Sequence, residues 1–119
     1  VRAIPDATTL AVTAQSDVRL PENGQTVAEE RRYEAIDDVY NQDDNKILIP
    51  SGAIIRGKYT NNGVYCAITW EAIYAHDDKN ENDRNAIDIS RVTAPTLCDP
   101  KKAIKYGDRV IINFTGSAK

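Results

Sequence analysis

The chain has 119 residues, which suffice for one domain with its own hydrophobic core but not for two. Its formal net charge is −3, and its 15 Lys and Arg residues are scattered among 18 Asp and Glu residues. A nucleic-acid partner is therefore not expected, because phosphate binding requires a basic stripe. No apolar run approaches the roughly 20 residues of a membrane helix, so no membrane-spanning segment is expected either. The chain starts at Val1, and we expect a processed mature protein or an excised domain.

Apolar and polar residues alternate with a period of two through most of the chain, and this period is typical of half-buried strands. The alternation predicts strands over residues 9–14, 17–20, 46–49, 53–59, 64–74, 86–92 and 108–115. Turn residues separate these runs, as at Pro50 to Gly52, Asn61 to Gly63 and Gly107. Short strands with frequent turns predict a mainly β fold, a small antiparallel β-barrel or sandwich formed by residues 1–119 as a single domain.

One segment departs from this pattern. Thr26 and Glu29 have the spacing of a capping box, in which the side chains of both residues cap the first turn of a helix. Tyr33 and Ile36 follow at the spacing of neighbours on one helix face. These features predict one short helix over residues 27–36.

Cys66 and Cys98 are the only cysteines. An even number in a small domain is compatible with a disulfide, which is typical of proteins outside the cytoplasm. The alternative is two buried thiols in a cytosolic protein, because a free Cys packs as a small apolar residue. The disulfide is the favoured interpretation, and with it an extracytoplasmic location.

No set of residues predicts a catalytic, cofactor or metal site. His76 is the only histidine, and ten residues of strand place it about 33 Å from Cys66, too far for a catalytic dyad. The polar segment 77–85 contains several acidic residues but lacks an EF-hand pattern. Counted from Asp78, Asp83 stands at position six, where a Gly is required, and Ile89 at position twelve, where a Glu is required. We interpret that segment as a solvated loop, with an irregular calcium site as the alternative. One His and two Cys are too few for zinc, and we expect no enzymatic activity.

The aromatic residues allow two interpretations. Trp70 could form a sugar-stacking surface with neighbouring tyrosines. However, it shares one predicted strand face with apolar residues, and a Trp in such a stripe usually belongs to the core. The predicted inward stripe, which favours the core, comprises Val64, Cys66, Ile68, Trp70, Ala72 and Tyr74.

Residues 46–59 have the sequence KILIPSGAIIRGKY and resemble the signature hairpin of the TrbI/VirB-type scaffold proteins of bacterial type IV secretion. In that family an apolar strand leads into Ile-Pro-x-Gly, and an alternating strand follows that ends in Gly-x-Tyr. The segment from Val64 to Trp70 and the strand after Gly107 are similar to the next and closing strands of the family. The motif positions that carry the resemblance are Ile49, Pro50, Gly52, Gly57, Tyr59, Trp70 and Gly107.

The resemblance implies a β-barrel in the outer-membrane core complex, arranged as a homo-oligomeric ring beside other envelope secretion-complex proteins. It also implies strands, not a helix, near residues 26–40. Residues 71–106 contain no apolar helix to match the membrane-inserting hairpin of the family. We expect a compact relative, periplasmic or outer-membrane-associated. Its function would be that of a non-catalytic structural subunit of a secretion or conjugation complex, assembling by protein–protein contacts. The alternative is a secreted β-domain that binds a glycan or cell-wall ligand.

Overall fold

The computed structural model describes residues 9–40, 47–74 and 86–115, and these residues form strands, turns and loops without a helix. The strands are β1 (Thr9–Ala14), β2 (Val27–Ala35), β3 (Val39–Tyr40), β4 (Ile47–Ile49), β5 (Ile54–Asn61), β6 (Cys66–Tyr74), β7 (Ile87–Asp88), β8 (Thr93–Ala94), β9 (Thr96–Leu97) and β10 (Arg109–Phe114). The mainly β fold predicted from the period-two pattern is confirmed.

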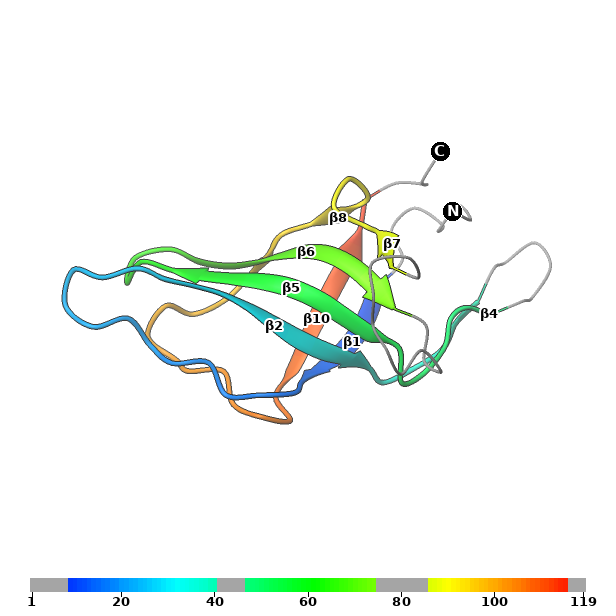
Figure 1. The fold of residues 1–119 in the computed structure, drawn as a ribbon, viewed down its shortest axis with the longest axis horizontal. Helices are drawn as coiled ribbons and strands as arrows, with labels where there is room; N and C mark the ends of the chain where they lie inside the picture. The colour runs from blue at the N-terminus through cyan, green and yellow to red at the C-terminus, as the bar shows by residue number, and fades with distance from the viewer. Residues whose placement is uncertain (1–8, 41–46, 75–85, 116–119) are drawn as a thin grey trace.

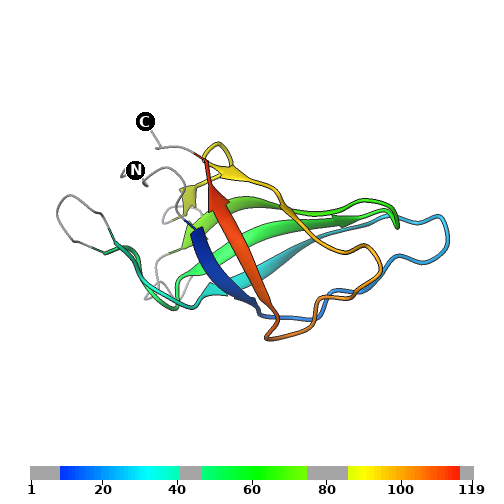
Figure 2. The same ribbon diagram turned by 180° about the vertical axis from the view of Figure 1, so that it is seen from behind.

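The strands form one large antiparallel sheet and one small one. The large sheet has eight strands in the order β7-β6-β5-β2-β1-β10-β8, and β9 pairs with β6. The sheet curls into a small half-barrel (Figures 1 and 2). The β3–β4 hairpin is a separate two-stranded sheet that projects from one end. The predicted antiparallel barrel is therefore confirmed in its architecture.

The two far sides of the curled sheet are bridged by residues 93–97. Here β8 pairs with β10, through Asn113 opposite Ala94, and β9 pairs with β6, through Ile68 opposite Thr96. Only Pro95 separates β8 from β9. Because proline lacks a backbone N–H and restricts the residue before it, the chain leaves β10 at this point and crosses to β6.

The core lies inside the curl and is built from large side chains. The largest fully buried ones are those of Trp70, Tyr33, Tyr59 and Phe114. The rings of Tyr33 and Trp70 meet edge to face, with 5.0 Å between their centroids. The interpretation of Trp70 as a core residue is confirmed.

The helix predicted over residues 27–36 is wrong, because this segment is the strand β2. Eight residues of β2 pair in register with β5, from Val27 opposite Asn61 to Glu34 opposite Ile54. On its other edge β2 pairs with β1. A helix would leave one edge of β1 and one edge of β5 unpaired, so tertiary hydrogen bonding outweighs the local capping signal.

The inward stripe predicted for β6 changes face at a β-bulge. Arg56 lies opposite Ala72, but the next residue of β5, Gly57, lies opposite Trp70, so Glu71 is the extra residue. A bulge reverses the alternation beyond it. As a result Ile73 joins the core cluster, whereas Ala72 and Tyr74 do not. Val64, at the start of the predicted stripe, lies in the hairpin turn and is 88% exposed.

Other predicted strands differ in extent. Residues 17–20 contain only an isolated bridge between Val18 and Ile104, and residues 86–92 contain only the two-residue strand β7. The turn at Pro50 to Gly52 forms as predicted: the Ala53 N–H donates to the Pro50 carbonyl at 3.1 Å, and Gly52 has a φ of 89°. No helix in the described part of the chain is long and apolar enough to cross a membrane.

Candidate protein-binding cleft

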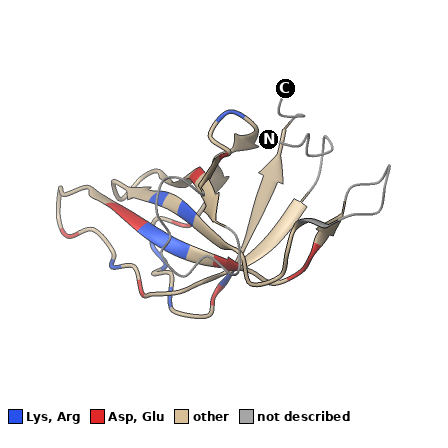
Figure 3. Cartoon of the chain, turned by 45° about the vertical axis from the view of Figure 1, so that its right-hand side comes forward, with Lys and Arg blue, Asp and Glu red and all other residues tan. Residues whose placement is uncertain are grey.

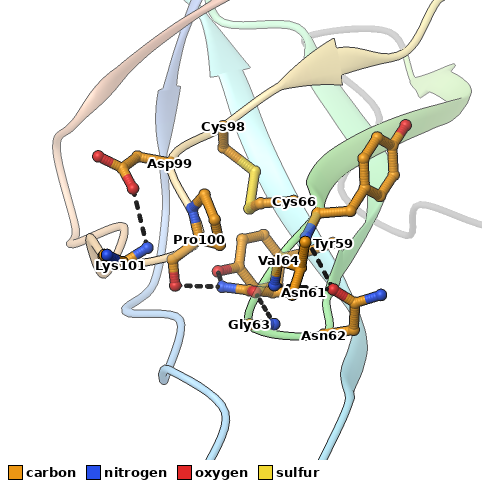
Figure 4. The surroundings of a disulfide bond; sticks show 11 residues. Tyr59, Asn61, Asn62, Gly63, Val64, Cys66, Cys98, Asp99, Pro100 and Lys101 are labelled. Atoms are coloured by element: carbon orange, nitrogen blue, oxygen red, sulfur yellow. Dashed lines mark hydrogen bonds between the residues drawn. A yellow bond between two sulfur atoms is a disulfide. The ribbon is translucent and has the colours of Figure 1, made fainter.

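Cys66 and Cys98 form the predicted disulfide (Figure 4). The bond joins the start of β6 to the segment after β9. A hydrogen bond near the disulfide also links β5 to this segment: the buried Asn61 side chain donates to the Pro100 carbonyl at 3.0 Å. The same side chain donates to the Tyr59 hydroxyl at 2.9 Å. The disulfide and Asn61 together hold residues 98–100 against the barrel wall, so both cysteines have a structural role.

Trp70 is fully buried and takes part in a short hydrogen-bond chain. Its indole N–H donates to the Thr96 hydroxyl at 2.9 Å, and that hydroxyl donates to the Ile111 carbonyl at 2.7 Å. The chain joins β6, β9 and β10 where they approach one another. Trp70 therefore offers no flat surface for a sugar ring, and the core interpretation is correct.

The other motif positions serve the fold at separate places and do not form one site. Ile49 ends β4, and Pro50 and Gly52 belong to the turn between β4 and β5. Gly107 lies in the turn before β10, with a φ of 88°. Gly57 and Tyr59 lie on β5, where the Tyr59 side chain is buried in the core.

A cluster of charged side chains lies on β2, where an acidic pair, Glu29 and Glu30, is followed by a basic pair, Arg31 and Arg32 (Figure 3). Glu29 forms ion pairs with Arg31 and with Arg19, the latter at 3.2 Å. Farther along the strand, burial raises the pKa of Tyr33 to about 12, an effect that the charge of Arg31 partly offsets. The Tyr33 hydroxyl is buried and forms no hydrogen bond with the described residues. It therefore remains protonated at neutral pH.

A polar pocket of about 390 Å³ lies beside β7 and contains charges that are already paired. The Arg56 and Glu71 side chains are 3.5 Å apart, and Arg56 also donates to the Tyr74 hydroxyl at 2.8 Å. Hydrogen bonds from Ser90 lower the pKa of Asp88. No group of three or more His, Cys, Asp or Glu residues within the described ranges could hold a metal ion. His76 and the acidic segment 77–85 lie outside the described residues.

The larger cleft, of about 580 Å³, lies between β10 and the segment that begins at β9. The first half of β10 forms one side, and β9 with residues 98–104 forms the other. It is lined by Ile68, Thr96, Leu97, Cys98, Asp99, Lys102, Ala103, Ile104, Asp108, Arg109, Val110 and Ile111. Two of these side chains are apolar and unusually accessible: Leu97 is 71% exposed and Ile111 is 41% exposed.

Within this cleft β10 has an open backbone edge. On the other side, β1 pairs with β10 from Arg109 to Asn113, whereas β8 covers only Asn113 and Phe114. Ile111 lies opposite Ala11, whose carbonyl accepts a hydrogen bond from Ile36 at 3.0 Å and so points toward β2. Because ladder hydrogen bonds alternate along an antiparallel pair, the backbone groups of Ile111 and Arg109 point away from β1 and into the cleft.

Three of these four backbone groups have no partner among the described residues. The Ile111 carbonyl accepts a hydrogen bond from the Thr96 hydroxyl. The Ile111 N–H and both backbone groups of Arg109 form no hydrogen bond with the described residues. The first half of β10 therefore pairs along one edge only. Pro95 is the residue that could have indicated the gap, since it diverts the covering strand after Ala94.

The cleft combines an open strand edge with accessible apolar side chains, which is the geometry that binds an extended peptide. In comparisons with known proteins, no family model and no curated sequence matched the chain.

Proposed function

We propose that the chain is a non-catalytic assembly module that binds an extended segment of another protein as an added strand along β10. The observation that carries this proposal is the open backbone edge from Arg109 to Ile111, which faces the cleft. In strand addition, main-chain hydrogen bonds provide affinity and side-chain pockets between them provide specificity. The cleft offers both, through the backbone of β10 and through the side chains of Leu97 and Ile111.

Two observations support a setting in the cell envelope. A disulfide is typical of oxidising compartments outside the cytoplasm, and Cys66 and Cys98 form one. Residues 46–59 resemble the signature hairpin of type IV secretion scaffold proteins, and Pro50, Gly52 and Gly57 lie at turn and bulge positions of the barrel. We infer a structural subunit of an envelope secretion or conjugation complex, at the periplasm or outer membrane. Burial of Trp70 removes the main support for the alternative, a glycan-binding domain.

The proposal is tested by removing one hydrogen-bond donor from the open edge. Ile111→Pro deletes an N–H that points into the cleft and makes no bond to β1, so the β1–β10 ladder is retained. Ile111→Val is the matched control, because it keeps the N–H with a side chain of similar size. The probe is a display library of ten-residue peptides, selected against the oxidised full chain and measured by fluorescence anisotropy.

We expect the selected peptides to bind the native chain and Ile111→Val with similar affinity, and Ile111→Pro at least tenfold more weakly, the loss of about one hydrogen bond. In the native chain, the amides of Arg109 and Ile111 should become protected from hydrogen exchange when the peptide binds. This second measurement requires no variant. A library without binders, or binders that leave both amides unprotected, would contradict strand addition at β10.

A further inference from the structure

The segment around the cleft is basic, although the chain as a whole is acidic. Residues 97–111 contain four basic residues, Lys101, Lys102, Lys105 and Arg109, against two acidic ones, Asp99 and Asp108, a difference of +2 in a chain of net charge −3. All four basic residues are exposed. Lys102 and Arg109 line the cleft on its opposite sides, one from the segment after β9 and one from β10.

The acidic residues of this segment are engaged in its own turns. Asp99 accepts the backbone N–H of Lys101 at 2.9 Å, and Asp108 accepts that of Lys105 at 2.9 Å. Within the described ranges, no carboxylate forms an ion pair with Lys102 or Arg109. Both carboxylates also line the cleft, but each is held by a backbone N–H of its own turn, whereas the Lys102 and Arg109 side chains are available to a partner.

Resting on the strand-addition function proposed above, we propose that the segment bound along β10 is an acidic peptide, with apolar residues in alternate positions and Asp or Glu flanking them. The alternation follows from strand geometry, since every second side chain of an added strand lies on the same face as Leu97 and Ile111. The acidic flanks follow from Lys102 and Arg109, two exposed cationic residues that line opposite sides of the cleft.

Three synthetic peptides test this preference. They are ten residues long and share one core of alternating Val and Thr, flanked at both ends by Glu, by Ser or by Lys. Binding to the oxidised full chain is measured by NMR titration at low and at high salt. We expect the Glu-flanked peptide to bind about 2- to 30-fold more tightly than the Ser-flanked one, the effect of two exposed ion pairs. The Lys-flanked peptide should bind most weakly, and the differences should shrink at high salt.

Charge reversal at the cleft provides the second measurement. The double variant Lys102→Glu, Arg109→Glu should prefer the Lys-flanked peptide. The matched control is Lys58→Glu, Arg91→Glu, which makes the same change of charge at exposed residues that do not line the cleft. This control should leave the order of the three peptides unchanged, which separates a local effect from one of net charge.

The outcomes distinguish this inference from the function on which it rests. If none of the three peptides binds, strand addition itself is contradicted. If all three bind with equal affinity and protect the Arg109 and Ile111 amides, strand addition is supported and the acidic preference is overturned. A preference for the Lys-flanked peptide in the native chain would also overturn it.

Discussion

The Trp70 indole lies directly against the backbone of Gly57, so that a Cβ at position 57 would stand 2.9 Å from the indole Cε3 atom. The same Cβ would lie 2.9 Å from Cγ2 of Ile68. Contacts this short are overlaps, so Gly57 is required by close packing. The register shift between β5 and β6 occurs at this point, with Gly57 opposite Trp70. The glycine thus allows the largest core side chain to pack directly against the backbone of the neighbouring strand.

Replacing Gly57 should therefore destabilise the fold. Gly57→Ala is expected to lower the free energy of unfolding by about 1–3 kcal/mol, the usual cost of overpacking a core. The measurement is urea-induced unfolding of the oxidised protein, followed by circular dichroism. The control is the same substitution in a Trp70→Leu background, where the smaller side chain should remove the part of the cost that comes from overlap with the indole, while the overlap with Ile68 remains. An unchanged midpoint for Gly57→Ala would contradict the close contact.

The disulfide should contribute strongly to stability because it closes a long loop. Cys66 and Cys98 are 32 residues apart, for which the chain-entropy model gives about 3–4 kcal/mol. We expect Cys66→Ser, Cys98→Ser to reduce the free energy of unfolding by this amount. Thiol titration of the native chain in denaturant without reductant should detect no free thiol. Two free thiols would contradict both the bond and the extracytoplasmic interpretation.

The hydroxyl of Thr96 should be needed where β6, β9 and β10 meet. Thr96→Val keeps the shape of the side chain but leaves the buried Trp70 N–H without an acceptor, at a cost of about 1–3 kcal/mol. Thr96→Ser is the matched control, since it retains the oxygen and should cost much less. Unfolding curves measure the two energies, and hydrogen exchange of the indole N–H reports the bond itself. Equal stability of the two variants would show that the hydroxyl is dispensable.

The sequence predicted those parts of the fold that depend on neighbouring residues. The period-two runs at β1, β5, β6 and β10, and the turns at Gly52 and Gly63, follow from local alternation and turn chemistry. The local pattern missed β2, although the family resemblance implied strands there, because its partners β1 and β5 are fixed by tertiary pairing, whereas Thr26 and Glu29 give a local helical signal. Such pairings lie outside any short sequence window.

The candidate site was less predictable than the fold. Its open edge exists because β8 leaves β10 at Pro95, and only the three-dimensional path of the chain shows which backbone groups then lack a partner. The disulfide was predictable from the number of cysteines. The basic character of residues 97–111 was hidden by the acidic composition of the whole chain. It becomes visible once Lys102 and Arg109 are known to line the same cleft.

Burial raises the pKa of the Tyr33 hydroxyl to about 12 from an ordinary value of 10.0. Between pH 10 and 12 the folded chain keeps a proton that the unfolded chain has lost, so the contribution of Tyr33 to stability is complete below pH 10 and is lost as the pH rises to 12. Two pH units correspond to at most about 2.7 kcal/mol. Tyr33→Phe removes both this titration and a hydroxyl without a hydrogen-bond partner, so it should be neutral or stabilising at pH 7. Urea unfolding of both proteins from pH 9 to 12 should show a steeper alkaline loss in the native chain, and parallel curves would contradict the raised pKa.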